Sequence, residues 1–69
     1  MEKITLKAAR VNAGMTQAQV AAIGEINPAT VYRWETGKAK PKSLEVMGLA
    51  YLYGVNVDDI IMPELLAKS

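Results

Sequence analysis

The 69-residue sequence contains no cysteine and no histidine. Without cysteine there can be no disulfide bond, which fits a reducing compartment such as the cytoplasm. Without histidine, neither a zinc site nor catalysis by an imidazole side chain is expected. No pairing of a nucleophile with a base and no set of metal ligands is apparent either. We therefore expect no enzyme, no catalytic residues, no metal and no cofactor.

A long hydrophobic run is also missing. The longest mostly apolar stretch, Val46–Val57, is interrupted by two glycines and an asparagine and is too short to span a bilayer. The N-terminal residues are polar and do not resemble a signal peptide. We expect no membrane association and a single domain over residues 1–69, in which residues 62–69 form a flexible or dimerising tail.

The net charge is only +1, which is small for a nucleic-acid-binding protein. The charges are nevertheless unevenly distributed along the chain. Four basic residues fall within ten positions: Arg33, Lys38, Lys40 and Lys42. Most of the acidic residues come later: Glu45, Asp58, Asp59 and Glu64. One side of the domain should be positive, and this basic cluster is either a binding surface or an ordinary solvated loop.

Hydrophobic periodicity predicts helices rather than strands, and capping residues delimit the first two. The first predicted helix contains Leu6 and Ala9 and is terminated by Gly14. Thr16, with a glutamine three residues later, forms a capping-box pattern for a second helix that Gly24 stops.

The third predicted helix follows the second after only about three residues. Asn27 is its N-cap and Pro28 its first residue; Val31 and Trp34 face the core, and Gly37 ends it. A spacing this short is typical of the turn in a DNA-reading helix-turn-helix unit.

Two further helices are predicted. Ser43 caps a fourth that ends at Gly54, and Asn56 caps a short fifth through Ile60 and Ile61. The predicted fold class is therefore all-α, with five helices and a helix-turn-helix formed by the second and third.

Several residues of this unit carry a family pattern: Thr16-Gln17, Val20-Ala21, Ile26-Asn27, Val31 and Trp34-Glu35-Thr36-Gly37. In them the sequence resembles the helix-turn-helix of lambdoid phage repressors and Cro proteins, the XRE family, over roughly residues 4–61. The resemblance implies a compact repressor-like domain that binds double-stranded DNA sequence-specifically. It further implies a transcriptional repressor that binds a palindromic operator as a homodimer, in the cytoplasm of a bacterial or phage-infected cell.

One position departs from the family pattern. The family usually has a leucine followed by a glycine where this chain has Gly24 and Glu25. A left-handed residue is needed in this turn, and glycine adopts that conformation most easily. We therefore expect Gly24 to be left-handed, the second helix to end one residue early, and Ile23 to replace the leucine in the packing.

The resemblance places the recognition helix, about residues 27–36, in the major groove of DNA. Its outer side presents Asn27, Pro28, Ala29, Tyr32 and Arg33. Arg33 can pair with guanine in a bidentate manner, or it can serve as a phosphate clamp or remain solvated. Ala29 suits a thymine methyl group or simply a close approach to the DNA.

Other residues have predicted roles at the DNA backbone or within the fold. Tyr32 either contacts the sugar-phosphate backbone or packs on the domain, and Thr30 either meets a phosphate or serves the first helical turn. Gln17 matches a position that contacts phosphate and supports the recognition helix; the alternative is an ordinary exposed glutamine. In the family, the loop that here carries Lys38, Lys40 and Lys42 lies along the phosphate backbone. Arg10 and Glu35 match a partly buried ion pair.

A homodimer on DNA would require a contact between copies, and the segment around Val57, Met62 and Leu65 is the candidate. No small-molecule ligand is expected because the chain has no room for a ligand domain. A function from another class is also open: an antitoxin-like protein-interaction module with secondary DNA binding. The acidic C-terminal region and the apolar Leu65-Leu66 pair could serve such a role.

Overall fold

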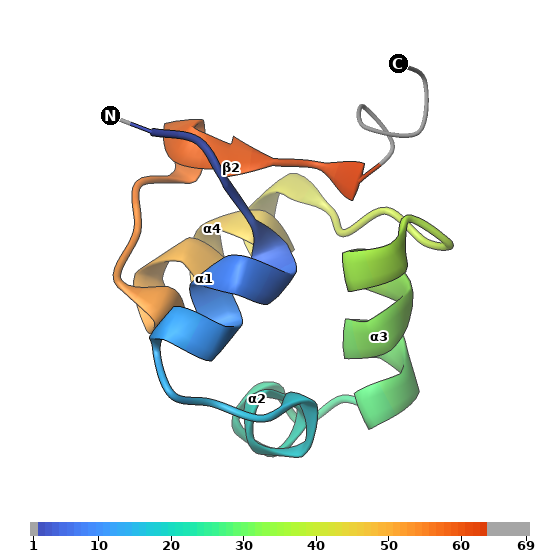
Figure 1. The fold of residues 1–69 in the computed structure, drawn as a ribbon. Helices are drawn as coiled ribbons and strands as arrows, with labels where there is room; N and C mark the ends of the chain where they lie inside the picture. Colours follow the sequence, from blue (N-terminus) through green and yellow to red (C-terminus); the bar gives the residue numbers. More distant parts are fainter. Residues whose placement is uncertain (1, 64–69) are drawn as a thin grey trace.

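The computed structural model describes residues 2–63, and within them it contains four α-helices, one 3-10 turn and two short strands (Figure 1). The elements in chain order are β1 (Ile4–Thr5), α1 (Leu6–Asn12), α2 (Gln17–Gly24), α3 (Pro28–Thr36), α4 (Ser43–Tyr53), the turn η1 (Val57–Asp59) and β2 (Ile60–Ile61). No helix in this part of the chain is long and apolar enough to cross a membrane.

Local capping explains where α2 and α3 begin, as the sequence predicted. The hydroxyl of Thr16 accepts a hydrogen bond from the backbone N–H of Gln19 at 3.1 Å, and the Gln19 side chain accepts one from the Thr16 N–H at 2.8 Å. The side-chain oxygen of Asn27 accepts from the Ala29 N–H at 2.9 Å. Gly37 ends α3 in the left-handed conformation, with φ of 81°.

The start of α4 differs from the prediction by one residue. Lys42, not Ser43, is the N-cap residue. The carboxylate of Glu45 accepts a hydrogen bond from the Lys42 backbone N–H at 2.7 Å. The carboxylate of Glu45 thus lies at the N-terminal end of the helix, where the helix dipole favours a negative charge.

The prediction for the turn between α2 and α3 is wrong. Gly24 is the last residue of α2, and Glu25 is the left-handed residue, with φ of 55°. The Ile26 N–H donates to the Ala21 carbonyl at 3.0 Å and the Glu25 N–H to the Ala22 carbonyl at 3.4 Å, which together form a Schellman motif.

The packing of Ile26 explains this register. Ile26 is half-buried against the hydrophobic core, whereas Ile23 is 59% exposed and does not replace the family's leucine. If residue 24 were left-handed instead, the turn would begin one residue earlier and Ile26 would no longer lie against the core. The apolar contact of Ile26 therefore outweighs the roughly 1–2 kcal/mol that a left-handed non-glycine residue costs.

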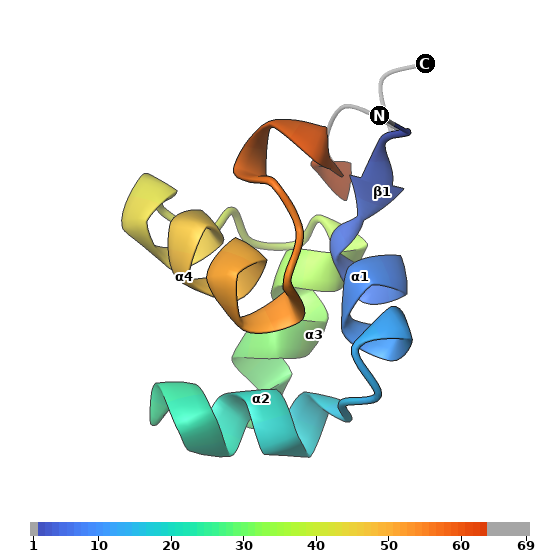
Figure 2. The same cartoon turned by 90° about the vertical axis from the view of Figure 1, so that its left-hand side faces the viewer.

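The predicted helical fold is confirmed in its main elements, but the fifth helix is not: over residues 2–63 the structure has four α-helices and a short two-stranded ladder. Residues 57–59 make a single 3-10 turn, after which Ile60 and Ile61 form β2. This strand pairs in parallel with β1, with Ile4 opposite Ile60 and Thr5 opposite Ile61. Two adjacent β-branched residues favour extended backbone, and the N-terminal segment supplies the hydrogen-bonding partner. Figure 2 shows β1 beside the C-terminal segment above the helices.

The hydrophobic core lies where the four helices meet. Its buried apolar members come from all of them: Leu6, Ala9, Val20, Ala21, Val31, Trp34, Leu49, Ala50 and Tyr53. The inward positions predicted for Val31 and Trp34 are confirmed, since these side chains are only 1% and 6% exposed. The parallel ladder closes the core from above because Ile4 and Ile60 pack against it.

Candidate nucleic-acid interface

The helix-turn-helix unit consists of α2, the turn at residues 25–27 and α3. Figures 1 and 2 show α3 standing upright, with α2 across its N-terminal end and the loop to α4 at its C-terminal end. Only a few residues separate the two helices, so the conformation of Glu25 and the packing of Ile26 set the angle between them.

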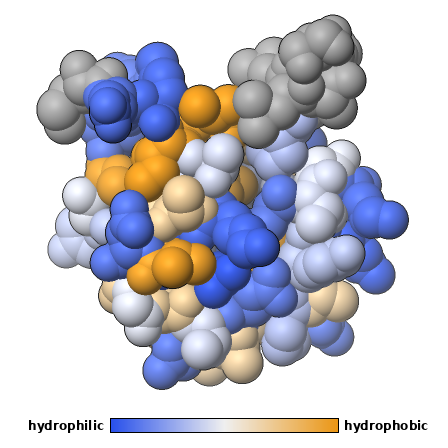
Figure 3. Space-filling view, in the orientation of Figure 1, coloured by the Kyte–Doolittle hydropathy of each residue, from blue (hydrophilic) through white to orange (hydrophobic). Residues whose placement is uncertain are grey.

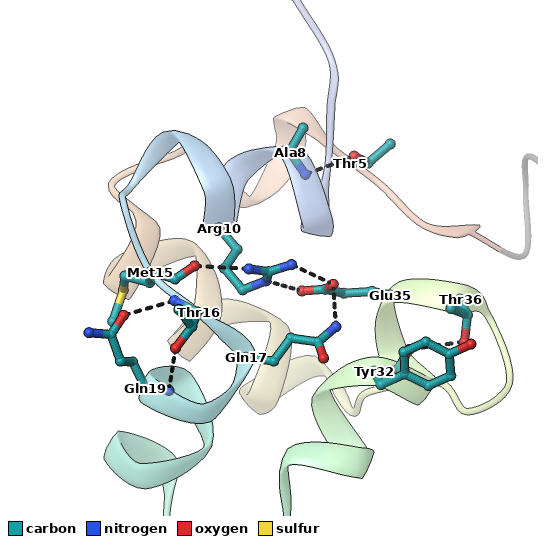
Figure 4. Close-up of polar contacts among 10 residues, drawn as sticks. All are labelled: Thr5, Ala8, Arg10, Met15, Thr16, Gln17, Gln19, Tyr32, Glu35 and Thr36. Atoms are coloured by element: carbon teal, nitrogen blue, oxygen red, sulfur yellow. Dashed lines mark hydrogen bonds and ion pairs between the residues drawn. The ribbon is translucent and has the colours of Figure 1, made fainter.

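A polar network joins α3 to the two helices before it (Figure 4). Arg10 Nε donates to Glu35 Oε2 at 2.6 Å and Arg10 Nη2 to Glu35 Oε1 at 3.1 Å, a bidentate ion pair. Gln17 Nε2 also donates to Glu35 Oε1, at 3.0 Å. Arg10 Nη1 reaches the Met15 carbonyl at 2.9 Å. One carboxylate on α3 therefore holds side chains from α1 and α2.

The network is buried, and its charges compensate each other. The side chains of Arg10 and Glu35 are only 10% and 3% exposed. Hydrogen bonding to Glu35 raises the pKa of Arg10, although desolvation acts against it. Burial raises the pKa of the neighbouring Tyr53 to about 12, and the charge of Glu35 adds to this effect. Arg10 is thus charged and Tyr53 neutral throughout the physiological pH range.

The ion pair is the one that the family resemblance implied, and Gln17 has the supporting contact expected of it. Two further features of this site have no signal in the sequence. The Met15 carbonyl is a backbone group, so its residue type gives no information about it. Tyr53 lies 43 positions from Arg10 along the chain, and no local pattern places its buried side chain where the charge of Glu35 helps to raise its pKa.

The outer side of α3 holds most of the predicted DNA-reading residues. Five of them are exposed: Asn27, Pro28, Ala29, Tyr32 and Arg33. Tyr32 is 49% exposed, and Thr30 is half-buried. Asn27 has its side-chain oxygen engaged as the helix cap, which leaves the amide nitrogen as its available donor. Because Glu35 is turned inward, Arg33 supplies the formal charge on the exposed side of α3.

The three predicted phosphate-contacting lysines lie beyond the C-terminal end of α3. Lys38, Lys40 and Lys42 are exposed in the loop to α4. The backbone N–H of Lys38 donates to the Arg33 carbonyl at 2.9 Å, and Pro41 is buried, so the loop is held at two points. In the space-filling view, the right-hand side over α3 is mostly blue or pale, as expected for a hydrophilic surface (Figure 3).

Residues 2–63 contain no cluster of acidic, histidine or cysteine side chains that could hold a metal ion. No curated protein and no solved structure matches the chain significantly. A family model described as helix-turn-helix matches residues 6–60, which include all four helices. With its α2–turn–α3 unit and this match, the chain belongs to the XRE-type helix-turn-helix family of DNA-binding regulators.

Proposed function

We propose that this regulator represses transcription by binding a palindromic operator as a homodimer, with α3 of each copy in the major groove. The observation that carries the proposal is the Arg10–Glu35–Gln17 network, in which the ion pair is buried and Gln17 is half-buried. It fixes α3 relative to α1 and α2 and leaves the opposite side of α3 exposed. A rigid helix with an exposed side of mixed polarity is what direct readout of base edges requires.

The base contacts that we propose come from three side chains of α3. Arg33 pairs with the O6 and N7 acceptors of guanine, since it has a planar fork of donors. Ala29, in the first turn, contacts the C5 methyl group of thymine. Asn27 contributes only its amide nitrogen as a donor, because its oxygen caps α3.

Contacts to phosphate would fix the register of the domain on the duplex. Gln17 stands at the first position of α2, where free backbone N–H groups favour an anion. Its amide nitrogen has two hydrogens and donates one bond to Glu35, so a second remains for a phosphate oxygen. Tyr32 and Thr30 would lie at the edges of the DNA major groove, and the three lysines of the α3–α4 loop would lie along the phosphate backbone of the DNA.

The homodimer contact proposed for the operator-bound state lies beside this loop. An apolar groove of about 320 Å³ is lined there by Lys40, Pro41, Ser43, Val46, Met47, Val57, Ile60 and Met62. It includes Val57 and Met62 of the predicted interface, whereas Leu65 lies outside the described residues. A contact here would bring the lysine loops of both copies to one stretch of DNA.

Selection of bound sites from random duplex DNA tests the proposal. We expect enriched sequences with two-fold symmetry whose half-sites lie about 34–36 Å apart, or one helical turn. Repression would then be measured with a reporter that carries the selected site between promoter elements. Enrichment of a single half-site without symmetry would contradict the dimer, and no enrichment at all would contradict sequence-specific binding.

A further inference from the structure

Two glycines in helical conformation line one groove of the domain. Gly24 is the last residue of α2, and Gly48 lies in the middle of α4. The groove between these helices has a volume of about 390 Å³, and Figure 2 shows the C-terminal end of α2 below α4. Neither residue is among the glycines with positive φ, which are Gly14, Gly37 and Gly54. Glycine inside a helix is destabilising relative to alanine, so the backbone does not explain these two positions.

Packing within the domain does not explain the two glycines either. A Cβ atom built on Gly48 would meet no atom of residues 2–63 within 4 Å. One built on Gly24 would meet only the side chain of Ile26, at 3.7 and 3.8 Å, which is ordinary van der Waals contact. Open space therefore lies beside both glycines, one on each wall of the groove.

The missing side chain at position 24 is one source of this open space. The family pattern usually has a leucine where this chain has Gly24, and Ile23 does not replace it, since Ile23 is 59% exposed. Ile26 and Trp34 line the groove beside Gly24. Removal of a leucine side chain from such surroundings leaves an apolar cavity, and apolar cavities of this kind can hold a small aromatic molecule.

The rest of the lining is apolar apart from one carboxylate. Among the ten lining residues are the buried Val20 and Leu49, and Glu45 is the one that carries a charge. The Oε1 atom of Glu45 accepts the Lys42 N–H at 2.7 Å, whereas Oε2 accepts no hydrogen bond from the described residues. An anion would find no counter-charge in this lining, and a cation would find one.

We propose that this groove binds a small aromatic amine. Its apolar part occupies the open space beside Gly24 and Gly48, and its ammonium group pairs with the free oxygen of Glu45. The lining positions of α4 run from residue 45 to residue 52, which is about 10 Å along the helix. One aromatic ring with a short alkyl chain matches this length.

The size and the charge of the groove favour this occupant over a macromolecule. Pockets for small molecules have volumes of about 300–1,000 Å³, apolar linings and a few polar groups, and this groove has all three properties. A nucleic acid would meet the carboxylate of Glu45 and no cation. A symmetric contact between two copies of the chain would bring two such carboxylates together without a cation between them.

The sequence predicts no small-molecule ligand because the chain has no room for a ligand domain, but this groove lies within the DNA-binding domain itself. None of the residues proposed to contact DNA lines it. Ile26 and Trp34 do line it, and both pack in the hydrophobic core that supports α3. A bound amine would therefore contact the helix-turn-helix unit and leave its outer side exposed. Binding can be measured without DNA, whether or not the proposed function holds.

Titration of the DNA-free chain with three probes of similar shape tests the proposal. Phenylbutylammonium, phenylbutanol and phenylbutanoate carry a positive charge, no charge and a negative charge at neutral pH. Trp34 is the single tryptophan and lines the groove, so its fluorescence reports binding. We expect a dissociation constant of about one millimolar for the ammonium probe, given its small size. The alcohol should bind about three- to fivefold more weakly, as for loss of an exposed ion pair, and the carboxylate more weakly still.

Leucine at either glycine should close the groove. Gly24→Leu and Gly48→Leu should each abolish the Trp34 response to the probes, because the new side chain fills the open space. Neither variant should lower the melting temperature, since leucine is the better helix former. Ala22→Leu is the matched control, because Ala22 is exposed on α2 outside the lining, and it should leave binding unchanged.

Glu45→Gln tests the charge of the site separately. The amide oxygen can still accept the Lys42 N–H, but the charge is lost, so the ammonium probe should bind no better than the alcohol. Glu2→Gln is the control, since Glu2 is exposed and lines a different groove. No response to any probe at about ten times the expected dissociation constant would overturn the proposal. Equal affinity for all three probes, or binding that survives both leucine variants, would overturn it as well.

Discussion

Helices α3 and α4 are neighbours in the chain, yet their exposed sides are opposites. α3 presents Tyr32 and Arg33 outward and directs its carboxylate, Glu35, into a buried network. α4 presents Leu44 and Tyr51 outward and has no comparable polar anchor. The first surface suits a charged, hydrogen-bonding partner such as DNA, and the second suits an apolar one. The difference is one of polarity between two adjacent helices of one small domain.

The largest expected effect comes from breaking the anchor of α3. Arg10→Ala should lower the free energy of unfolding by about 3–5 kcal/mol, because it leaves the buried carboxylate of Glu35 without its counter-charge. Urea denaturation followed by circular dichroism measures this loss. Lys7→Ala, at an exposed position of the same helix, is the control and should change stability by less than about 0.5 kcal/mol. A loss from Arg10→Ala as small as that of the control would show that the network does not hold α3.

The next largest effect concerns the base pair that Arg33, on the exposed side of α3, is proposed to recognise. Arg33→Ala should reduce the preference for one G·C pair in each half-site by about 1–3 kcal/mol, since a bidentate contact to guanine is removed. The affinities of wild type and variant for specific and random duplexes, measured at one salt concentration, separate base reading from phosphate binding. Equal losses on both duplexes would assign Arg33 to the phosphate backbone.

A smaller effect is expected in the loop that connects the two helices. The double variant Lys38→Ala, Lys40→Ala should weaken binding similarly for all DNA sequences, because phosphate contacts carry no sequence information. Each lost phosphate contact should also flatten the slope of log affinity against log salt by about 0.9. Titrations at several salt concentrations measure the slope, and an unchanged value would exclude the loop from the interface.

The smallest effect concerns the turn before α3. Glu25→Gly should stabilise the domain by about 1 kcal/mol, because glycine adopts the left-handed conformation without the penalty that Glu25 bears. Thermal unfolding measures the change. Gly24→Ala is the informative companion, since Gly24 is helical and an added Cβ would make only ordinary contacts with Ile26. A large loss from Gly24→Ala would indicate that position 24 requires glycine after all.

Sequence reasoning succeeded for most local determinants, although it placed the N-cap of α4 one residue late. Thr16, Asn27 and Gly37 act within three or four residues of themselves, so their caps could be predicted from residue type alone. The left-handed residue at Glu25 could not be predicted in this way, because the packing of Ile26 against distant residues decides it. Residue type favours glycine at such a position, but tertiary packing outweighs that preference.

The site was predictable to a similar extent. The positions of Gln17 and Glu35 came from the family pattern, and their hydrogen bond spans 18 residues that no local rule connects. The outward direction of Arg33 followed from helical periodicity once Val31 and Trp34 were placed inside. The predicted role of Asn27 as an N-cap already implies that its side-chain oxygen accepts a hydrogen bond. The geometry then shows that the amide nitrogen is what remains for a contact with a base.

The parallel ladder between β1 and β2 has a consequence for the order of folding. It joins residues 56 positions apart, so closing it costs about 3–4 kcal/mol of chain entropy in a simple polymer estimate. Two residue pairs cannot offset that cost alone, whereas the helices, once packed, bring the two strands together in advance. The ladder should therefore form last and open first, and the amides of Ile60 and Ile61 should exchange with solvent faster than those in the interior of α3. The pairing of β1 with β2 would then follow the folding of the α2–turn–α3 unit.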